Sequence, residues 1–130
     1  MTTAKTVLLV EDYPDLRELF AEMLNAAGYS TLSAPDGKAA LATASGHSGT
    51  IDFLFTDIVM PNMLGTDLAS ELKRVRPELR VLYMSGYANP AIAGGAPLPP
   101  GAKLLQKPFM ESDLIEKLNE LMAEPAQALR

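Results

Sequence analysis

Five short apolar runs, separated by helix-like segments and turns, constrain the fold of this chain more than any other feature. They cover residues 6–10, 30–34, 51–57, 81–84 and 103–106. Bounded apolar runs of this length are typical of buried strands. Strands that alternate with helices predict a parallel sheet with helices on both faces. We therefore expect one α/β domain in which the crossovers between strands are right-handed.

Four of the intervening segments carry apolar residues at helical spacing. The first begins at Pro14 and is expected to stop at Gly28, the second follows the candidate cap Asp36, and the third ends before Pro77. A last helix is expected from Glu111. The apolar sides predicted for the four helices are Leu16, Leu19, Phe20, Met23, Leu24 and Ala27; Ala39, Ala40, Leu41 and Ala44; Leu68, Leu72 and Val75; and Leu114, Ile115, Leu118, Leu121 and Met122.

Two segments have the composition of irregular structure. Residues 88–101 contain four prolines, three glycines and no charged residue, so any fourth helix there is expected to be short or irregular. Residues 45–50 are rich in Ser and Gly and are expected to form a loop. This loop holds His47, the only histidine, which we interpret as a solvated residue rather than a catalytic one.

The composition disfavours several classes of function. A length of 130 residues suits one domain with an ordinary core. The net charge of −5 disfavours sequence-independent binding to nucleic acid or to anionic membranes. The lack of cysteine excludes disulfides and Cys-based metal sites and is compatible with a cytoplasmic location. No apolar run has transmembrane length, and the N-terminal stretch before the first strand is too short for a signal peptide.

Polar residues follow four of the five predicted strands. Glu11 and Asp12 follow the first strand, Asp57 ends the third, Ser85 follows the fourth, and Lys107 follows the fifth. In an open α/β sheet the ligand site lies beyond the carboxyl ends of the strands. One Asp alone is more often a turn or cap residue than a catalytic one, but five polar residues at one edge of the sheet predict a site.

This set of residues is suited to phosphoryl transfer. Three carboxylates in a partly desolvated cleft repel one another unless one is protonated or a cation lies between them. Carboxylate oxygens without Cys or a nearby His favour a hard ion such as Mg²⁺. Lys107 and Ser85 supply a positive charge and a hydroxyl for the phosphoryl oxygens. Asp57 is central in the sequence pattern and is the best candidate for an acceptor that forms an aspartyl phosphate.

The same residues carry a family resemblance, which extends from about Lys5 to about Ala123. The chain resembles the receiver domain of two-component response regulators, and most of all the receivers of hybrid sensor histidine kinases and free-standing response regulators. The resemblance implies a flavodoxin-like (βα)5 fold, a doubly wound five-stranded parallel sheet in the order 2-1-3-4-5. The motifs that carry it are Glu11-Asp12, Asp57 with Met60-Pro61 and Gly65, Ser85-Gly86, and Lys107-Pro108-Phe109.

The resemblance also implies roles for the acidic residues. Asp57 would accept a phosphoryl group from a phosphohistidine. Asp12 and Asp57 would bind Mg²⁺ directly, together with the backbone carbonyl of Val59, and Glu11 would act through water. The partner would be a histidine kinase or a histidine phosphotransfer protein, with no nucleic acid or membrane involved.

A second set of residues would contact the phosphoryl group and transmit the change. Ser85 and Lys107 would contact the phosphoryl oxygens, and the bond between Lys107 and Pro108 would be cis. Movement of Ser85 would reshape the face formed by the fourth helix, the fifth strand and the fifth helix. Leu104 stands where many receivers have an aromatic switch residue, so Tyr87 is considered as a partial substitute.

We therefore expect a signalling module rather than an enzyme, with residues 1–123 as a single receiver domain and 124–130 as a frayed tail. The chain is expected to lack an output domain and to be a monomer or a weak phosphorylation-dependent dimer. The alternative is a receiver-like interaction module that works without phosphorylation. A Mg²⁺-dependent phosphate-ester hydrolase is a more distant alternative, because such enzymes usually have a second Asp soon after the first, and Asp57 is followed by Ile58-Val59.

Overall fold

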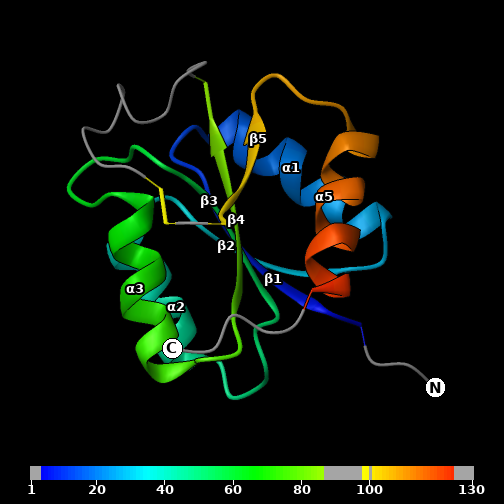
Figure 1. Cartoon of the computed structure of the whole chain (residues 1–130). Helices are drawn as coiled ribbons and strands as arrows, with labels where there is room; N and C mark the ends of the chain where they lie inside the picture. Colours follow the sequence, from blue (N-terminus) through cyan, green and yellow to red (C-terminus); the bar gives the residue numbers. More distant parts are fainter. Residues whose placement is uncertain (1–3, 87–97, 100, 125–130) are drawn as a thin grey trace.

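The computed structural model describes residues 4–86, 98–99 and 101–124. Its centre is a sheet of five parallel strands in the order β2-β1-β3-β4-β5 (Figure 1), as the resemblance implied. This is the predicted α/β architecture. The strands are β1 (Thr6–Val10), β2 (Ser30–Ala34), β3 (Phe53–Asp57), β4 (Arg80–Ser85) and β5 (Lys103–Gln106).

Four helices of the described chain cover the two faces of the sheet. They are α1 (Pro14–Ala26), α2 (Gly37–Gly46), α3 (Gly65–Val75) and α5 (Glu111–Ala123). Helices α2 and α3 lie on one side of the sheet, and α1 and α5 lie on the other (Figure 1). Nearly all of the segment predicted to hold a short or irregular fourth helix lies outside the described residues. No helix in the described ranges is both long enough and apolar enough to cross a membrane.

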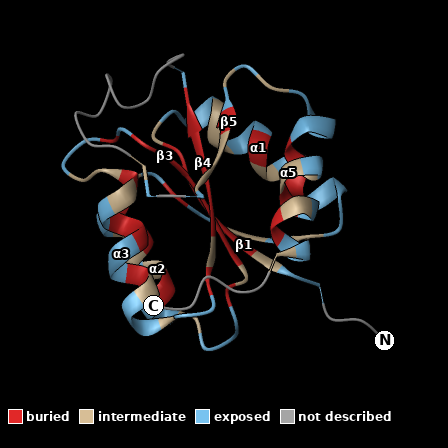
Figure 2. Cartoon of the chain, in the orientation of Figure 1, coloured by how far each residue is buried: buried red, intermediate tan, exposed pale blue. Residues whose placement is uncertain are grey.

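Strict alternation along the strands divides the core into two clusters, one on each face. On β3, Phe53 and Phe55 join the cluster that contains Leu24 of α1 and Leu118 of α5, whereas Leu54 joins the cluster under α2 and α3. All five residues of β3 are buried, and the sheet forms the buried centre in Figure 2. Burying apolar side chains on both faces holds β3, and thus Asp57 at its end, in a fixed position.

Helix boundaries follow the predicted signals, with one correction. Asp36 caps α2, since its Oδ1 accepts a hydrogen bond from the backbone N of Ala39 at 2.8 Å. Gly28 follows α1 with a φ of 97°, a conformation that favours glycine. The loop predicted for residues 45–50 begins later than expected, because α2 continues through Gly46.

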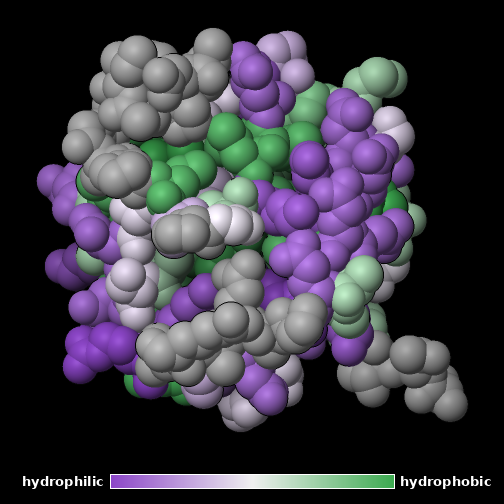
Figure 3. Space-filling model, viewed as in Figure 1, coloured by the Kyte–Doolittle hydropathy of each residue, from purple (hydrophilic) through white to green (hydrophobic). Residues whose placement is uncertain are grey.

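Four predicted apolar positions are wrong, because their side chains are exposed. Leu19, Val75 and Met122 are 43, 75 and 36% exposed, and Ala27 is exposed as well. Ala27 directly follows α1 and Val75 is the last residue of α3, whereas Leu19 and Met122 lie at the margin of helix faces that are wider than their contact with the sheet. Hydrophilic residues otherwise gather over the outer sides of α3 and α5 in Figure 3.

Two strands have bounds that differ from the prediction. Strand β3 begins at Phe53 rather than at residue 51, and β4 is one residue longer at each end than predicted.

Candidate functional site at the carboxyl edge of the sheet

The carboxyl ends of β1, β3, β4 and β5 meet at one edge of the sheet and surround a cleft of about 320 Å³. The five polar residues predicted from the sequence come together here, because Glu11 is ion-paired to Lys107 and the other four line the cleft. Backbone N of Lys107 donates to the carbonyl of Ser85 at 2.8 Å, which ties the end of β5 to the end of β4. The cleft is lined by Asp12, Tyr13, Leu16, Asp57, Val59, Met84, Ser85, Gly86 and Lys107.

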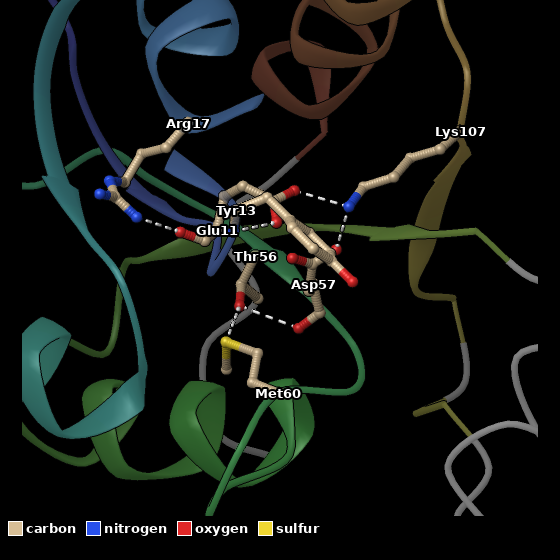
Figure 4. Close-up of polar contacts among 7 residues, drawn as sticks. All are labelled: Glu11, Tyr13, Arg17, Thr56, Asp57, Met60 and Lys107. Carbon is tan, nitrogen blue, oxygen red and sulfur yellow. Dashed lines mark hydrogen bonds and ion pairs between the residues drawn. The ribbon is translucent and has the colours of Figure 1, made fainter. Parts of the chain in front are cut away.

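The Lys107 side chain bridges two buried carboxylates. Its Nζ lies 2.6 Å from Oε1 of Glu11 and 2.7 Å from Oδ1 of Asp57 (Figure 4). Glu11 is fully buried and Asp57 is 6% exposed, so both carboxylates are largely removed from water. A buried charge is costly unless it is paired, and Lys107 pairs both acids at once.

Burial and mutual repulsion separate the pKa values of the two acids. Burial raises the pKa of Asp57 to about 7, the negative charge of Glu11 adds to the rise, and the hydrogen bond from Lys107 opposes it. Burial would also raise the pKa of Glu11, but hydrogen bonds from Lys107 and Asp57 and the backbone N of Tyr13 lower it overall. Burial works against the charge of Lys107, yet its hydrogen bonds to Asp57 and Glu11 raise the pKa of the ammonium group. Without a cation, Asp57 is therefore the acid that takes up a proton near neutral pH, whereas Glu11 keeps its charge.

The oxygen atoms of the site fit a hard divalent cation. One carboxylate oxygen from each of Glu11, Asp12 and Asp57 can be chosen so that all three lie within 4.8 Å of one another. Oδ2 of Asp57 is buried and accepts no hydrogen bond from any described residue, although its partner oxygen is bound to Lys107. A buried acceptor without a donor is costly, and a cation with oxygen ligands such as Mg²⁺ would satisfy it. Val59 lies on the rim, 42% exposed.

Aromatic packing fixes the loop that carries Lys107. The Phe109 ring lies 4.7 Å from the ring of Phe20 on α1 and 5.9 Å from the ring of Phe55 on β3, measured between centroids. Nζ of Lys107 lies 5.9 Å from the centroid of the Phe20 ring. The ammonium group thus reaches the acids along an apolar wall that limits its movement.

The other predicted residues have mixed outcomes. The peptide bond between Lys107 and Pro108 is cis, as the resemblance implied. Leu104 is half-buried on β5 and packs against the cluster under α2 and α3. Tyr87, considered as a partial switch residue, lies outside the described residues. His47 follows α2 and does not line the cleft.

Several residues near the site were not predicted from the sequence. Tyr13 lies on the rim and is 63% exposed, and its position directly after two acids was the available signal. Arg17 donates from Nη1 to the backbone carbonyl of Glu11 at 2.9 Å, and the Thr56 hydroxyl contacts the carbonyl of Asp57 (Figure 4). Contacts with backbone carbonyls leave no residue pattern, so the sequence gives no signal for them.

A comparison with protein families assigns the chain. Residues 7–119 match the family model described as the response regulator receiver domain. The chain belongs to this family. The match covers the five strands except Thr6, including the carboxyl ends of the four strands that surround the cleft, so the cleft described above lies within the receiver domain.

Receiver domains of known name resemble this one over nearly its full length. It is 32% identical to the response regulator receiver protein CpdR of Brucella abortus over 91% of this chain and 97% of that protein. It is 33% identical to the sensor kinase CckA of the same organism over 94% of this chain but only 13% of the kinase. A crystal structure of a CckA receiver domain, 32% identical, matches with a TM-score of 0.75 over 90% of this chain and 98% of that one.

A further solved structure that matches this chain contains Mg²⁺. The response regulator TrrA of Thermotoga maritima, in complex with Mg²⁺ and BeF, is 28% identical and matches with a TM-score of 0.71, over 90% of this chain and 98% of that one.

Replacing Lys107 with methionine is expected to raise the pKa of Asp57 beyond its value of about 7. The hydrogen bond from Lys107 is the largest of the contacts that lower this pKa, and methionine keeps most of the side-chain volume without the charge. The pKa can be measured by NMR from the pH dependence of the Asp57 carboxyl signal in the absence of divalent cations. Lys117→Met is the matched control, since Lys117 pairs on the surface with Glu120. An unchanged Asp57 pKa in Lys107→Met would contradict the pairing.

Proposed function

We propose that this receiver domain accepts a phosphoryl group on Asp57 from a phosphohistidine of a histidine kinase or phosphotransfer protein. One observation carries the proposal: Asp57 has a buried oxygen without a hydrogen-bond donor among the described residues, in a cleft where Lys107 and two further acids converge. A nucleophilic carboxylate beside a fixed positive charge is the arrangement that aspartyl phosphate formation requires.

In the proposed step, the P–N bond of the phosphohistidine breaks as a P–O bond forms to a carboxylate oxygen of Asp57. The electron pair of the broken bond stays on the imidazole nitrogen, and the ring, protonated on its other nitrogen, leaves as neutral histidine. Lys107 would turn its ammonium group from the carboxylate toward the phosphoryl oxygens, and the Ser85 hydroxyl at the end of β4 would donate to them. Because the catalytic contribution of the protein is mainly positioning and charge stabilisation, these few groups suffice.

The residues present fit Mg²⁺, which we propose as the cofactor. Asp12, Asp57 and the backbone carbonyl of Val59 would hold it directly, and Glu11 would act through water. When bound, the ion neutralises the carboxylates and the phosphoryl oxygens that approach them. The complex of TrrA with Mg²⁺ and BeF supports this assignment.

The wider role follows from the family. We propose a cytoplasmic signalling protein rather than an enzyme with a separate substrate, in which residues 1–123 form the receiver and 124–130 a tail. Phosphorylation would draw Ser85 toward the phosphoryl group and change the face near β5 and α5. Leu104 of β5 stands in place of an aromatic switch residue and packs against the cluster under α2 and α3, on the side of the sheet opposite α5. The domain would act as a monomer or a weak phosphorylation-dependent dimer.

Intact-mass spectrometry after incubation with Mg²⁺ and acetyl phosphate tests the proposal. We expect a gain of one phosphoryl group in the wild type and no gain in Asp57→Asn or in the presence of EDTA. Asp67→Asn, on the exposed first turn of α3, is the matched control and should gain the group normally. If the folded wild type gains nothing from acetyl phosphate or phosphoramidate, the domain would instead act by binding alone, without phosphorylation.

A further inference from the structure

Thr56 is a buried polar residue that the phosphoryl-transfer site does not account for. Among the described residues four polar or charged side chains are buried, and the other three, Glu11, Asp57 and Ser85, belong to the site. Thr56 is completely buried and does not line the cleft. Its presence in the core therefore needs a physical reason.

The position of Thr56 on the sheet would suit valine. Alternation along β3 points its side chain to the face opposite Asp57, and its neighbours in register are Val10 on β1 and Tyr83 on β4. Both neighbours belong to the apolar cluster under α2 and α3. Valine has nearly the same shape and avoids the cost of burying a hydroxyl, which is about 1–3 kcal/mol when no hydrogen bond is made. The hydroxyl must therefore make a useful contact.

The hydroxyl of Thr56 holds the backbone next to the phosphoacceptor. Its Oγ1 lies 2.9 Å from the carbonyl oxygen of Asp57 and 3.6 Å from Sδ of Met60 (Figure 4). A hydroxyl has a single proton, and the carbonyl is the stronger of these two acceptors. The contact thus satisfies a buried carbonyl, and the sulfur beside it connects the strand end to the loop that follows.

The same carbonyl lies against the backbone at Gly65. A Cβ at Gly65 would overlap the Asp57 carbonyl oxygen, and the backbone N of Gly65 donates to the carbonyl of Ile58 at 2.6 Å. The peptide that leaves Asp57 is therefore held between a hydroxyl and the start of α3. This peptide sets the direction of the Asp57 side chain and leads two residues later to Val59.

We infer that Thr56 is a positioning residue, whose hydroxyl fixes the Asp57 carbonyl so that the carboxylate and the Val59 carbonyl are aimed together at the cleft. The inference rests on the proposed phosphoacceptor function. A positioning role requires that loss of the hydroxyl alone weaken cation binding and phosphoryl acceptance, even where the fold is intact. Small displacements of reacting groups are enough to cost large factors in rate.

Two matched pairs of variants isolate the hydroxyl. Thr56→Val removes the hydroxyl and keeps the shape of the side chain. Thr56→Ser and Thr56→Ala both lack the methyl group of threonine, but only Thr56→Ser keeps the hydroxyl. Thr31→Val is the control, because the hydroxyl of Thr31 on β2 bonds to Asn25 away from the cleft. Mg²⁺ affinity is measured by calorimetry, the rate of phosphorylation by acetyl phosphate by intact mass, and folding by circular dichroism.

We expect Thr56→Val to lower both the Mg²⁺ affinity and the phosphorylation rate on the order of tenfold, with Thr56→Ser within about threefold of the wild type and Thr56→Ala as impaired as Thr56→Val. If Thr56→Val does not fold, the difference in Mg²⁺ affinity and phosphorylation rate between Thr56→Ser and Thr56→Ala decides whether the hydroxyl has a positioning role. The inference is overturned if the folded variants without the hydroxyl match their hydroxyl-bearing partners. If the wild type itself is not phosphorylated, the proposed function fails instead, and the Mg²⁺ affinities alone then decide whether Thr56 positions the acids.

Discussion

Asp57→Asn is expected to be more stable than the wild type above pH 7 in the absence of divalent cations. Asp57 binds its proton more tightly in the folded protein, with a pKa of about 7, than in the unfolded chain, where the value is 3.8. Folding therefore takes up a proton between these values, so stability contributed by the protonated carboxyl is complete below pH 4 and is lost as the pH rises to 7. At roughly 1.4 kcal/mol per pKa unit, the loss is at most about 4 kcal/mol.

Asparagine removes the charge that causes this loss and keeps an oxygen that can accept from Lys107. Urea unfolding at several pH values should give a variant that is about 1–4 kcal/mol more stable than the wild type at pH 8 and a difference that shrinks toward pH 4. Asp67→Asn is the matched control, and its free energy of unfolding should fall by about a few tenths of a kcal/mol. The negative charge of Asp67 in the first turn of α3 interacts favourably with the positive end of the helix dipole, and asparagine removes this charge. Equal or lower stability of Asp57→Asn at pH 8 would show that the ion pair with Lys107 outweighs the repulsion from Glu11.

Addition of Mg²⁺ should make the wild type more stable than Asp57→Asn, the reverse of the order expected without the ion. An ion that binds only the folded wild type stabilises it by an amount that grows with the ratio of ion concentration to Kd. Asp57→Asn lacks one of the proposed ligands, so its unfolding midpoint should change little. The same carboxylate would therefore destabilise the cation-free domain and stabilise the domain that has bound the proposed ion, which would explain an acid at a buried position.

The sheet and the acids at the carboxyl ends of its strands could be predicted because both follow from local patterns in the sequence. The apolar runs gave the strands, and Asp57 at the end of a run fully buried on both faces gave the site. The buried positions of the helices were predicted less accurately than the strands, because a periodic pattern also includes residues such as Val75 that extend past the sheet. How much of a helix surface is buried depends on the strands and helices packed against it, and a local sequence pattern carries no information about them.

The arrangement inside the site could be predicted only in part. Repulsion among the three acids indicated that at least one would be protonated unless a cation lay between them, and a pKa of about 7 for Asp57 in the absence of a cation agrees with this. The sequence placed Lys107 near the phosphoryl group but could not show that it bridges Asp57 and Glu11, a residue 96 positions away. The roles of Arg17 and Thr56 depend on carbonyl groups of the backbone, which every residue has, so only the structure distinguishes them.

Gly65→Ala is expected to be the most damaging small substitution near the site. The added Cβ would overlap the carbonyl oxygen of Asp57 and press on the backbone of Ile58, and neither can yield as a flexible side chain would. Over-packing of this kind costs about 1–3 kcal/mol and sometimes more. Because the displaced carbonyl is the one held by Thr56, the strain falls on the acceptor itself, and phosphorylation by acetyl phosphate should be slower by at least about tenfold.

Gly46→Ala provides the matched control, since Gly46 ends α2 and a Cβ there meets no described atom within 4 Å. Alanine is favoured over glycine in a helix, so this variant should be unchanged or more stable by up to about 1 kcal/mol, with normal phosphorylation. Urea unfolding and intact-mass kinetics on both variants separate the two effects. If Gly65→Ala is as stable and as reactive as Gly46→Ala, the peptide after Asp57 is not held against α3, and the positioning role of Thr56 loses its support. If Gly65→Ala is slowed in phosphorylation beyond its loss of stability, the geometry of this single peptide governs the acceptor.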